Sequence, residues 1–331
     1  MTKARPSTWS LTLLKLVSSL ALIGMILGLA DISEVAARFA SIEPEPVAIA
    51  IALCFSQILL AGIRWHIIGL CTGRFIGRWQ TVRAIFAAMF CNQLLPTSIG
   101  GDIVRVGLLV RLGVPTGRAA RTVVLDRTAG LLSLLTLMMV TSIVLGEHLP
   151  PAWPVNIIQS LPVAVIALVL GLLFIGDRVA GIVERWLRLI WVAGVLRDSN
   201  RVLRGGFSTL VILFLSYGIH CASAASIWVL ARGLGVEIDF IQVLGFLPIV
   251  ILMVLLPLSI AGWGVREGTI LALFALLGIE STSAFAVSLL WGVTIAVSAI
   301  AAGAIWGLTR SRGERLLGWE ISLDAKDPQA P

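Results

Sequence analysis

Long apolar segments, separated by short polar ones, run along nearly the whole chain. Their approximate limits are 11–30, 47–69, 80–95, 103–112, 122–146, 155–176, 208–231, 241–257, 265–278 and 284–308. Six of these segments have about 20 residues or more, the length that an α-helix needs to cross a bilayer. Membrane-spanning strands would instead alternate over about ten residues. The pattern predicts an all-α polytopic membrane domain over 1–310 and a short cytoplasmic tail over 311–331.

The four shorter segments form two pairs, and a cluster of Pro and Gly separates the members of each pair. The breaks run from Pro96 to Gly101 and from Pro257 to Gly264. Proline interrupts a helix and glycine permits a tight turn. Each pair therefore predicts a helical hairpin, the first over 80–112 and the second over 241–278.

The two breaks are copies of one motif. LLPTSIGGDIVRVG, which begins at Leu94, aligns with LLPLSIAGWGVREG, which begins at Leu255, with nine identities in 14 positions. The identities include a Pro, a Ser, two Gly and an Arg, and chance similarity between apolar helices would supply leucines but not the arginine. The chain therefore contains an internal repeat, with Arg105 and Arg266 at equivalent positions.

The basic residues divide the polar segments into two sides of the membrane. Of the 25 Lys and Arg, 21 fall near the termini and around 64–83, 111–127 and 177–204. The segments of the other side hold only Arg38 and Arg232, beside eight acidic residues. The positive-inside rule places the basic side in the cytoplasm. We therefore expect an inner-membrane protein with both termini in the cytoplasm.

This assignment gives the two hairpins opposite directions. The first begins and ends in basic sequence, whereas the second begins and ends beside acidic residues. Three full crossings lie between them, so the repeat is inverted, as in many transporters whose site lies near the bilayer midplane. The prediction is six full crossings, of which 11–30 is the first and is not cleaved, and two re-entrant hairpins.

The repeated arginines are the strongest candidates for a functional role. A cation at membrane depth is unfavourable unless it pairs with an acid or faces water. Arg105 and Arg266 each lie one turn into a half-helix, where unpaired N–H groups attract anions and a guanidinium can hold phosphate through two nitrogens. We therefore expect an anion site where the hairpin tips meet. Its lining residues would be Ser98, Gly100, Gly101, Ser259 and Gly262.

The acidic neighbours of these arginines, Asp102 and Glu267, leave several roles open. They can cap the half-helices, pair with the arginines, or bind the amine of a headgroup. A second interpretation is purely structural, because these four charges can form an ion-pair network that only holds the hairpins together.

Other polar residues in apolar surroundings give weaker signals. Asn92 can line the site or bond across helices, and Asp126 and Arg127 can bind a headgroup or extend to the interface. His220 is expected to be an interhelical hydrogen-bond partner. Three adjacent residues are expected to be interfacial anchors: Arg64, Trp65 and His66. An amphipathic pattern from Val179 to Trp191 predicts either an interfacial helix or a cytoplasmic extension of a neighbouring helix.

The composition excludes several function classes. With 58% hydrophobic and 13% charged residues the chain is too apolar for a soluble domain, and its net charge of +7 is spread over short loops, which argues against nucleic-acid binding. The four Cys lack metal-ligand spacing, and no phosphate loop, HExxH or GxSxG motif occurs. We expect no metal, no cofactor and no catalytic residue.

The strings FCNQLLPTSIGGDIVRVGLLVRLGV, VVLDRTAGLL and LLPLSIAGWGVREGTILALFALLGI resemble the lysylphosphatidylglycerol synthase transmembrane-region family of flippase-like bacterial membrane proteins, over about 10–310. The resemblance implies a lipid flippase-like fold without enzymatic activity, since the aminoacyl-transferase domain of its two-part members is missing here. Carried over by position, it marks Pro96, Gly100, Gly101, Asp102, Arg105, Asp126, Arg127, Gly130, Gly262, Gly264, Arg266 and Glu267.

These observations lead to one expected function and two alternatives. The expected function is translocation of a phosphate-bearing lipid, a phospholipid or an aminoacyl-phospholipid, between the leaflets of the membrane. The first alternative replaces the cargo by a polyprenyl-phosphate or another glycan-carrier lipid. The second is a non-transporting partner of a lipid- or glycan-modifying enzyme. A homo-oligomer is compatible with each.

Overall fold

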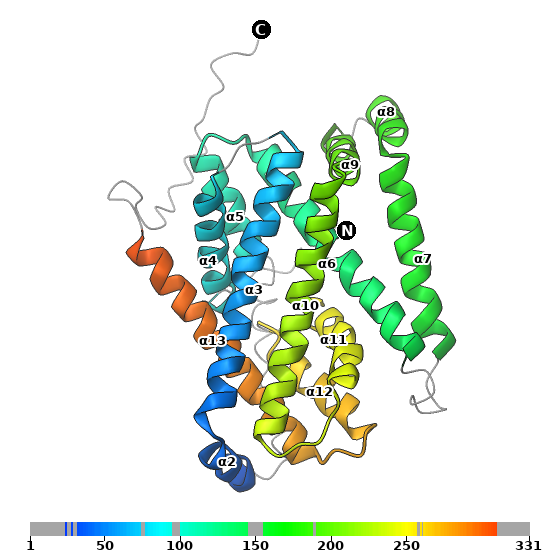
Figure 1. Cartoon of the computed structure of the whole chain (residues 1–331). Coiled ribbons are helices and arrows are strands. Elements are labelled where there is room, and N and C mark those ends of the chain that lie inside the picture. The colour runs from blue at the N-terminus through cyan, green and yellow to red at the C-terminus, as the bar shows by residue number, and fades with distance from the viewer. Residues whose placement is uncertain are drawn as a thin grey trace, which may run out of the picture.

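The structure is a computed structural model that describes Gly24, Gly28 and residues 32–73, 77–94, 100–144, 155–187, 190–256, 259 and 261–309. Within these residues every regular element is an α-helix, which confirms the all-α part of the predicted fold class (Figure 1). The helices are α2 (Ile32–Ser41), α3 (Pro44–Cys71), α4 (Arg78–Leu94), α5 (Gly100–Arg111), α6 (Thr116–Val144), α7 (Val155–Phe174), α8 (Gly176–Leu187), α9 (Ile190–Leu203), α10 (Phe207–Gly233), α11 (Phe240–Leu255), α12 (Val265–Ala275) and α13 (Ser281–Leu308).

Four long helices are apolar enough to cross a membrane, and each overlaps a predicted crossing. They are α3, α6, α10 and α13, each of 27 to 29 residues. The predicted crossing at 155–176 forms α7, which can join α8 as one bent span, with a 70° angle between the two axes. The first predicted crossing, 11–30, lies almost entirely outside the described residues, so the count of six stays a prediction.

The amphipathic segment after α7 is not a straight extension of that helix. It forms α8 and the start of α9, two short helices that pack against each other at one end of the molecule (Figure 1). Large apolar side chains of this pair, Ile182, Ile190 and Trp191, are exposed. The interfacial interpretation is therefore the better of the two that the pattern allows.

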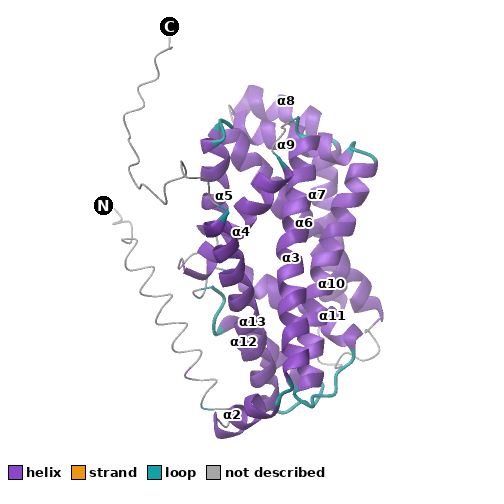
Figure 2. Cartoon of the chain, turned by 60° about the vertical axis from the view of Figure 1, so that its left-hand side comes forward, coloured by secondary structure: helices purple, strands orange, loops and turns teal. Residues whose placement is uncertain are grey.

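Both predicted hairpins are pairs of packed helices. α4 packs against α5, and α11 against α12. The second break has a left-handed backbone at Ala261 (φ 49°), Gly262 (φ 81°) and Gly264 (φ 87°), which explains the glycines, since left-handed conformations favour this residue. Figures 1 and 2 both place α4 and α5 in one half of the molecule and α11 and α12 in the other half.

Different polar segments lie at the two ends of the molecule, which are called the acidic end and the basic end after the charges of their segments. At the acidic end, α2, α10 and α13 meet, because Arg38 donates a hydrogen bond to the Leu234 carbonyl (3.4 Å) and pairs with Glu280 (3.7 Å). At the basic end, α6 meets α9 through the ion pair of Arg121 and Asp198 (2.8 Å). Figure 2 shows α8 and α9 far from α2, along the axis of the long helices. The described polar segments thus separate into the two groups that the charge pattern predicts.

Each hairpin has its own hydrophobic core, and α13 contributes to both. The larger core joins side chains of α10, α11, α12 and α13, including Leu247, Ile270 and Val287. The smaller joins α3, α4, α5 and α6 with the far end of α13, around Phe86 and Leu109. The two hairpins are therefore packed along one helix, each against a different part of it.

Candidate functional site

Five charged residues from three helices form a continuous network at the start of α5, here called the α5 cluster. Its members are Arg64 of α3, Asp102 and Arg105 of α5, and Asp126 and Arg127 of α6. The sequence analysis marked four of them, and the structure brings all four together. It adds Arg64, which is 62 residues away from Asp126 in the sequence.

Asp126 lies between two arginines at the centre of the α5 cluster. Its two carboxylate oxygens accept hydrogen bonds from Arg64 Nε and Arg105 Nη2, both at 2.8 Å. Asp102 accepts two further bonds from Arg127, Nε to Oδ2 at 3.0 Å and Nη2 to Oδ1 at 3.1 Å, and lies 3.5 Å from Arg105 Nη1. Positive and negative groups therefore alternate, as favourable packing of charges requires.

The α5 cluster extends from the interior to the surface of the protein. The exposed fraction of the side chain rises from 3% at Asp126 and 4% at Arg105 to 18% at Asp102 and 47% at Arg127. Three arginines and two aspartates give the cluster a net charge of +1. The Nε atom of Arg105 is buried and has no hydrogen-bond partner in the described part of the chain. The cluster therefore has an excess positive charge and one buried donor that is not used.

Neighbouring helices hold Arg105 and the start of α5 in place. Arg105 lies over the ring of Trp65, with its Cζ 4.1 Å from the ring centroid, and Trp65 Nε1 donates to Thr122 (3.3 Å). Asn92 of α4 accepts a hydrogen bond from the Gly101 N–H (2.7 Å), one of the N–H groups that a helix start leaves unpaired. A Cβ on Gly101 would lie 2.6 Å from this Asn92 oxygen, so the glycine permits the contact.

A second group of charged residues lies at the start of α12 and is here called the α12 cluster. Its members are Arg266, the other repeated arginine, and Glu267. Arg266 pairs with Glu267, and the other carboxylate oxygen of Glu267 accepts a hydrogen bond from the Gly264 N–H (2.6 Å) at the start of α12. Both charged residues are buried. Because it has one positive and one negative residue, the α12 cluster is electrically neutral, unlike the α5 cluster.

Aromatic rings and a glycine enclose Arg266. Its Cζ lies 4.5 Å from the ring centroid of Trp263 and 5.8 Å from that of Trp291. A Cβ on Gly292 of α13 would overlap the guanidinium, so this glycine makes the space that Arg266 occupies. Both repeated arginines are thus buried against tryptophan, which stabilises a cation through the ring face.

The structure describes only some of the remaining predicted site residues. Gly100, Gly262 and Ser259 are buried at the breaks, whereas Ser98 and Pro96 lie outside the described residues. Within the described part of the chain no hydrogen bond or ion pair joins the α5 and α12 clusters. The meeting of the two hairpin tips therefore stays a prediction.

The prediction that Arg64, Trp65 and His66 are interfacial anchors was wrong. All three side chains are buried. Arg64 donates to Ser216 of α10 (3.1 Å) in addition to its bond with Asp126. These residues follow an apolar run and precede a basic loop, which is typical of an interface, and only packing against α6 and α10 places them inside.

The histidine of α10 is an interhelical hydrogen-bond partner, as predicted. His220 Nε2 lies 3.1 Å from both Ser133 Oγ and the Gly130 carbonyl of α6. Among the described residues no group of three His, Cys, Asp or Glu side chains has the geometry of a metal site. Guanidinium groups can bind carboxylate or phosphate through two nitrogens, and in both clusters they pair with carboxylates of the protein itself.

Comparison with known families identifies the type of membrane domain. Residues 13–303 match the family described as the lysylphosphatidylglycerol synthase TM region. The comparison with curated proteins gave no match. The family match includes both repeated motifs, every member of the α5 cluster and every residue of the α12 cluster. Because it covers well over half of the chain, this multi-pass membrane protein belongs to the lysylphosphatidylglycerol synthase TM region family.

Proposed function

We propose that this protein moves a phosphate-bearing lipid between the leaflets of the bacterial inner membrane, without chemically changing it. The observation that carries the proposal is the α5 cluster, a buried network with a net charge of +1 at the start of a half-helix. Charged residues buried in a membrane domain are costly and rare, and they commonly mark a functional site. The family to which the chain belongs takes its name from the synthesis of a lipid, which agrees with a lipid as cargo.

In this proposal the phosphate enters along the gradient of exposure in the α5 cluster. Arg127, the most exposed member, meets the headgroup first, and the phosphate then takes the place of the Asp102 carboxylate between Arg127 and Arg105. Phosphate and carboxylate bind to guanidinium with the same two-point geometry, so this exchange preserves the hydrogen bonds of both arginines. The lipid tails stay in the bilayer.

The α12 cluster is the second half of the proposed route. We infer that the two hairpins enter from opposite faces, with the basic end in the cytoplasm, as the positive-inside rule expects. Arg266 would then receive the phosphate from Arg105. Its pairing with Glu267 makes the second cluster neutral, so it would hold an anion less tightly and favour release toward the acidic end.

Leaflet exchange in liposomes tests this mechanism. The purified protein is reconstituted with fluorescent phosphatidylglycerol, and exchange is followed by chemical quenching of the outer leaflet. Arg105→Gln is expected to slow exchange at least about tenfold, since it removes a charge-assisted contact with phosphate. Adding Asp102→Asn restores the net charge of +1 but not the guanidinium, and exchange is expected to stay slow.

Arg121→Gln is the matched control, because Arg121 is also a largely buried, paired arginine but lies outside both clusters. It is expected to exchange lipid at the rate of the unaltered protein. Exchange no faster than in empty liposomes, or an unaffected rate for Arg105→Gln, would contradict the proposal.

The same assay separates the two alternatives. A labelled polyprenyl-phosphate shares the phosphate group, and faster exchange of this lipid than of phosphatidylglycerol would identify a glycan carrier as cargo. Absence of exchange for both lipids, together with a stable enzyme that co-purifies, would favour the non-transporting partner.

A further inference from the structure

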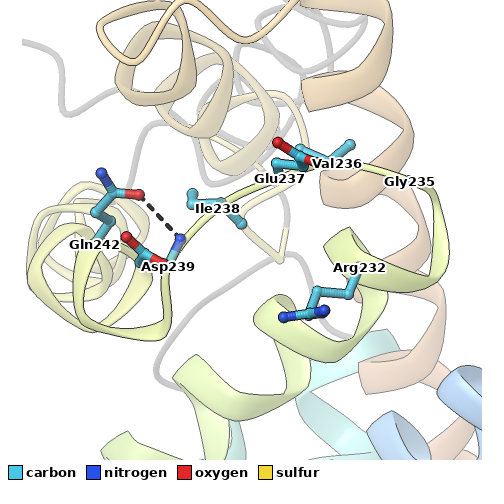
Figure 3. Close-up of a pocket in the computed structure, with 7 residues that line it drawn as sticks. All are labelled: Arg232, Gly235, Val236, Glu237, Ile238, Asp239 and Gln242. Atoms are coloured by element: carbon cyan, nitrogen blue, oxygen red, sulfur yellow. Dashed lines mark hydrogen bonds between the residues drawn. The ribbon is translucent and has the colours of Figure 1, made fainter.

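A cavity of about 640 Å³ lies at the acidic end, outside both clusters. It is formed where α10 ends, where α11 begins and along the loop between them (Figure 3). Arg232 projects from the last turn of α10, and Asp239 and Gln242 lie across from it at the start of α11. The residues that line it are Arg232, Gly235, Val236, Glu237, Ile238, Asp239 and Gln242.

The cavity holds opposite charges that do not pair with each other. Arg232 and Glu237 are both exposed, and within the described residues neither side chain makes an ion pair or a hydrogen bond. Asp239 adds a second carboxylate, so the lining carries a net charge of −1. A free guanidinium and a free carboxylate in one cavity can bind a ligand that also carries both signs.

Backbone and aromatic contacts keep this cavity in shape. Arg232 Cζ lies 5.4 Å from the ring centroid of Trp228, whose Nε1 donates to the Ile238 carbonyl (3.1 Å). On the opposite wall, the Asp239 N–H donates to Gln242 Oε1 (3.0 Å), as Figure 3 shows. Arg232 and the backbone at Asp239 are thus held before a ligand arrives, which lowers the entropy that they lose on binding.

The cavity is next to a surface suited to lipid. Phe240 and Ile241, which follow Asp239 directly, are partly exposed, and Phe240 contacts the Trp228 ring edge to face at 6.0 Å. Tryptophan is enriched at the level of lipid headgroups. A headgroup in the cavity would therefore leave its glycerol and acyl chains beside apolar side chains.

We propose that this cavity binds a lipid headgroup that carries both a phosphate and an ammonium group. Arg232 would hold the phosphate, and Glu237 and Asp239 would hold the ammonium group. A headgroup with phosphate alone is disfavoured, because it would meet two carboxylates and one guanidinium. This inference rests on the proposed function for its choice of a lipid, and it adds a subsite at the acidic end that selects cargo by its amine.

Binding to the full-length protein in maltoside micelles tests the inference. Isothermal titration calorimetry is carried out with short-chain phosphatidylethanolamine, short-chain phosphatidylglycerol and free phosphoethanolamine. Phosphatidylethanolamine is expected to bind at least about tenfold more tightly than phosphatidylglycerol, as loss of one charged contact predicts. Free phosphoethanolamine is expected to bind more weakly than the lipid, because it lacks the acyl chains that would contact Phe240 and Ile241.

Two variants address the two charges separately. Arg232→Gln and Glu237→Gln are each expected to weaken phosphatidylethanolamine binding about tenfold, and both positions are exposed, so the fold should tolerate them. Only Glu237→Gln is expected to reduce the preference over phosphatidylglycerol. Glu45→Gln, an exposed acid in the first turn of α3 at the same end, is the control and should change neither affinity.

Equal binding of the two lipids, or an unchanged affinity in Glu237→Gln, would overturn the inference. Tighter binding of free phosphoethanolamine than of the lipid would also overturn it and would identify a site for a soluble ligand. Arg105→Gln separates this inference from the proposed function, since it should slow exchange at least about tenfold but leave the preference for phosphatidylethanolamine over phosphatidylglycerol, which the cavity supplies, in place. If the unaltered protein exchanges lipid but binds no phosphatidylethanolamine, only the cavity proposal fails.

Discussion

Asp126 is the residue on which the α5 cluster depends, because it pairs with two buried arginines at once. Removing one partner of a buried ion pair leaves an uncompensated charge, which lowers the free energy of unfolding by about 3–5 kcal/mol. We therefore expect Asp126→Asn to lower the thermal midpoint strongly in detergent. Asp102→Asn is the comparison, since its main partner Arg127 is 47% exposed and can be hydrated. Equal shifts for the two variants would show that Asp126 is not the centre of the network.

Gly292 permits the burial of the second repeated arginine. An added Cβ would overlap the Arg266 guanidinium, so Gly292→Ala should force this side chain away from Trp291 and Glu267. We expect leaflet exchange to fall about tenfold or more. Gly307→Ala is the control on the same helix, because nothing lies within 4 Å of its added Cβ. If both variants exchange lipid at the normal rate, the position of Arg266 does not matter for transport.

Charged residues show how far single residues can be predicted from sequence. Arg105 and Arg266 could be selected because each stands in a repeated motif within an apolar region, and both are buried. Arg64 could not, because its sequence neighbours resemble an interface and its partners Asp126 and Ser216 come from other helices. Depth in the membrane depends on which helices pack together, and local hydropathy contains no information about such long-range pairs.

At the scale of elements, the packed arms of the first hairpin also share a hydrogen bond at the start of α5. Asn92 Oδ1 satisfies the Gly101 N–H, and loss of such a capping bond lowers stability by about 1–2 kcal/mol. We expect Asn92→Leu to lower both the thermal midpoint and the rate of leaflet exchange. Asn92→Asp keeps an acceptor oxygen near the positive helix start, so it should retain both. Similar losses for the two variants would exclude capping as the role of Asn92.

The hairpins themselves were predictable, because Pro and Gly mark the breaks and the repeat confirms that they are not accidental. The sequence also predicted helices close to the limits of α4, α5, α11 and α12. It did not predict that the segment after α7 divides into α8 and α9, since an amphipathic pattern shows a helix face but not where the chain turns. The bend of 70° before α8 depends on packing between α8 and α9.

At the scale of the whole molecule, the repeat and the charge distribution reinforce each other. The starts of α4 and α6 lie at the basic end together with α8 and α9. α2 and the starts of α11 and α13 lie at the acidic end (Figures 1 and 2). α13 packs against α4 of the first hairpin and α12 of the second, so the two hairpins are joined through this helix. In the proposed route, the cargo would meet the charged α5 cluster at one stage and the neutral α12 cluster at the next.

Accessibility of the two ends is the most direct test of this arrangement. In a chain whose four Cys are replaced by Ala, Glu45→Cys should react with an impermeant maleimide in intact cells, because we place the acidic end outside. Arg204→Cys should react only after the cells are opened. Trp79→Cys and Leu112→Cys, at the start of α4 and just after α5, are both exposed and should behave like Arg204→Cys if the first hairpin is re-entrant. Reaction of Trp79→Cys and Leu112→Cys from opposite sides would show instead that α4 and α5 together cross the membrane, and the inverted repeat would have to be abandoned.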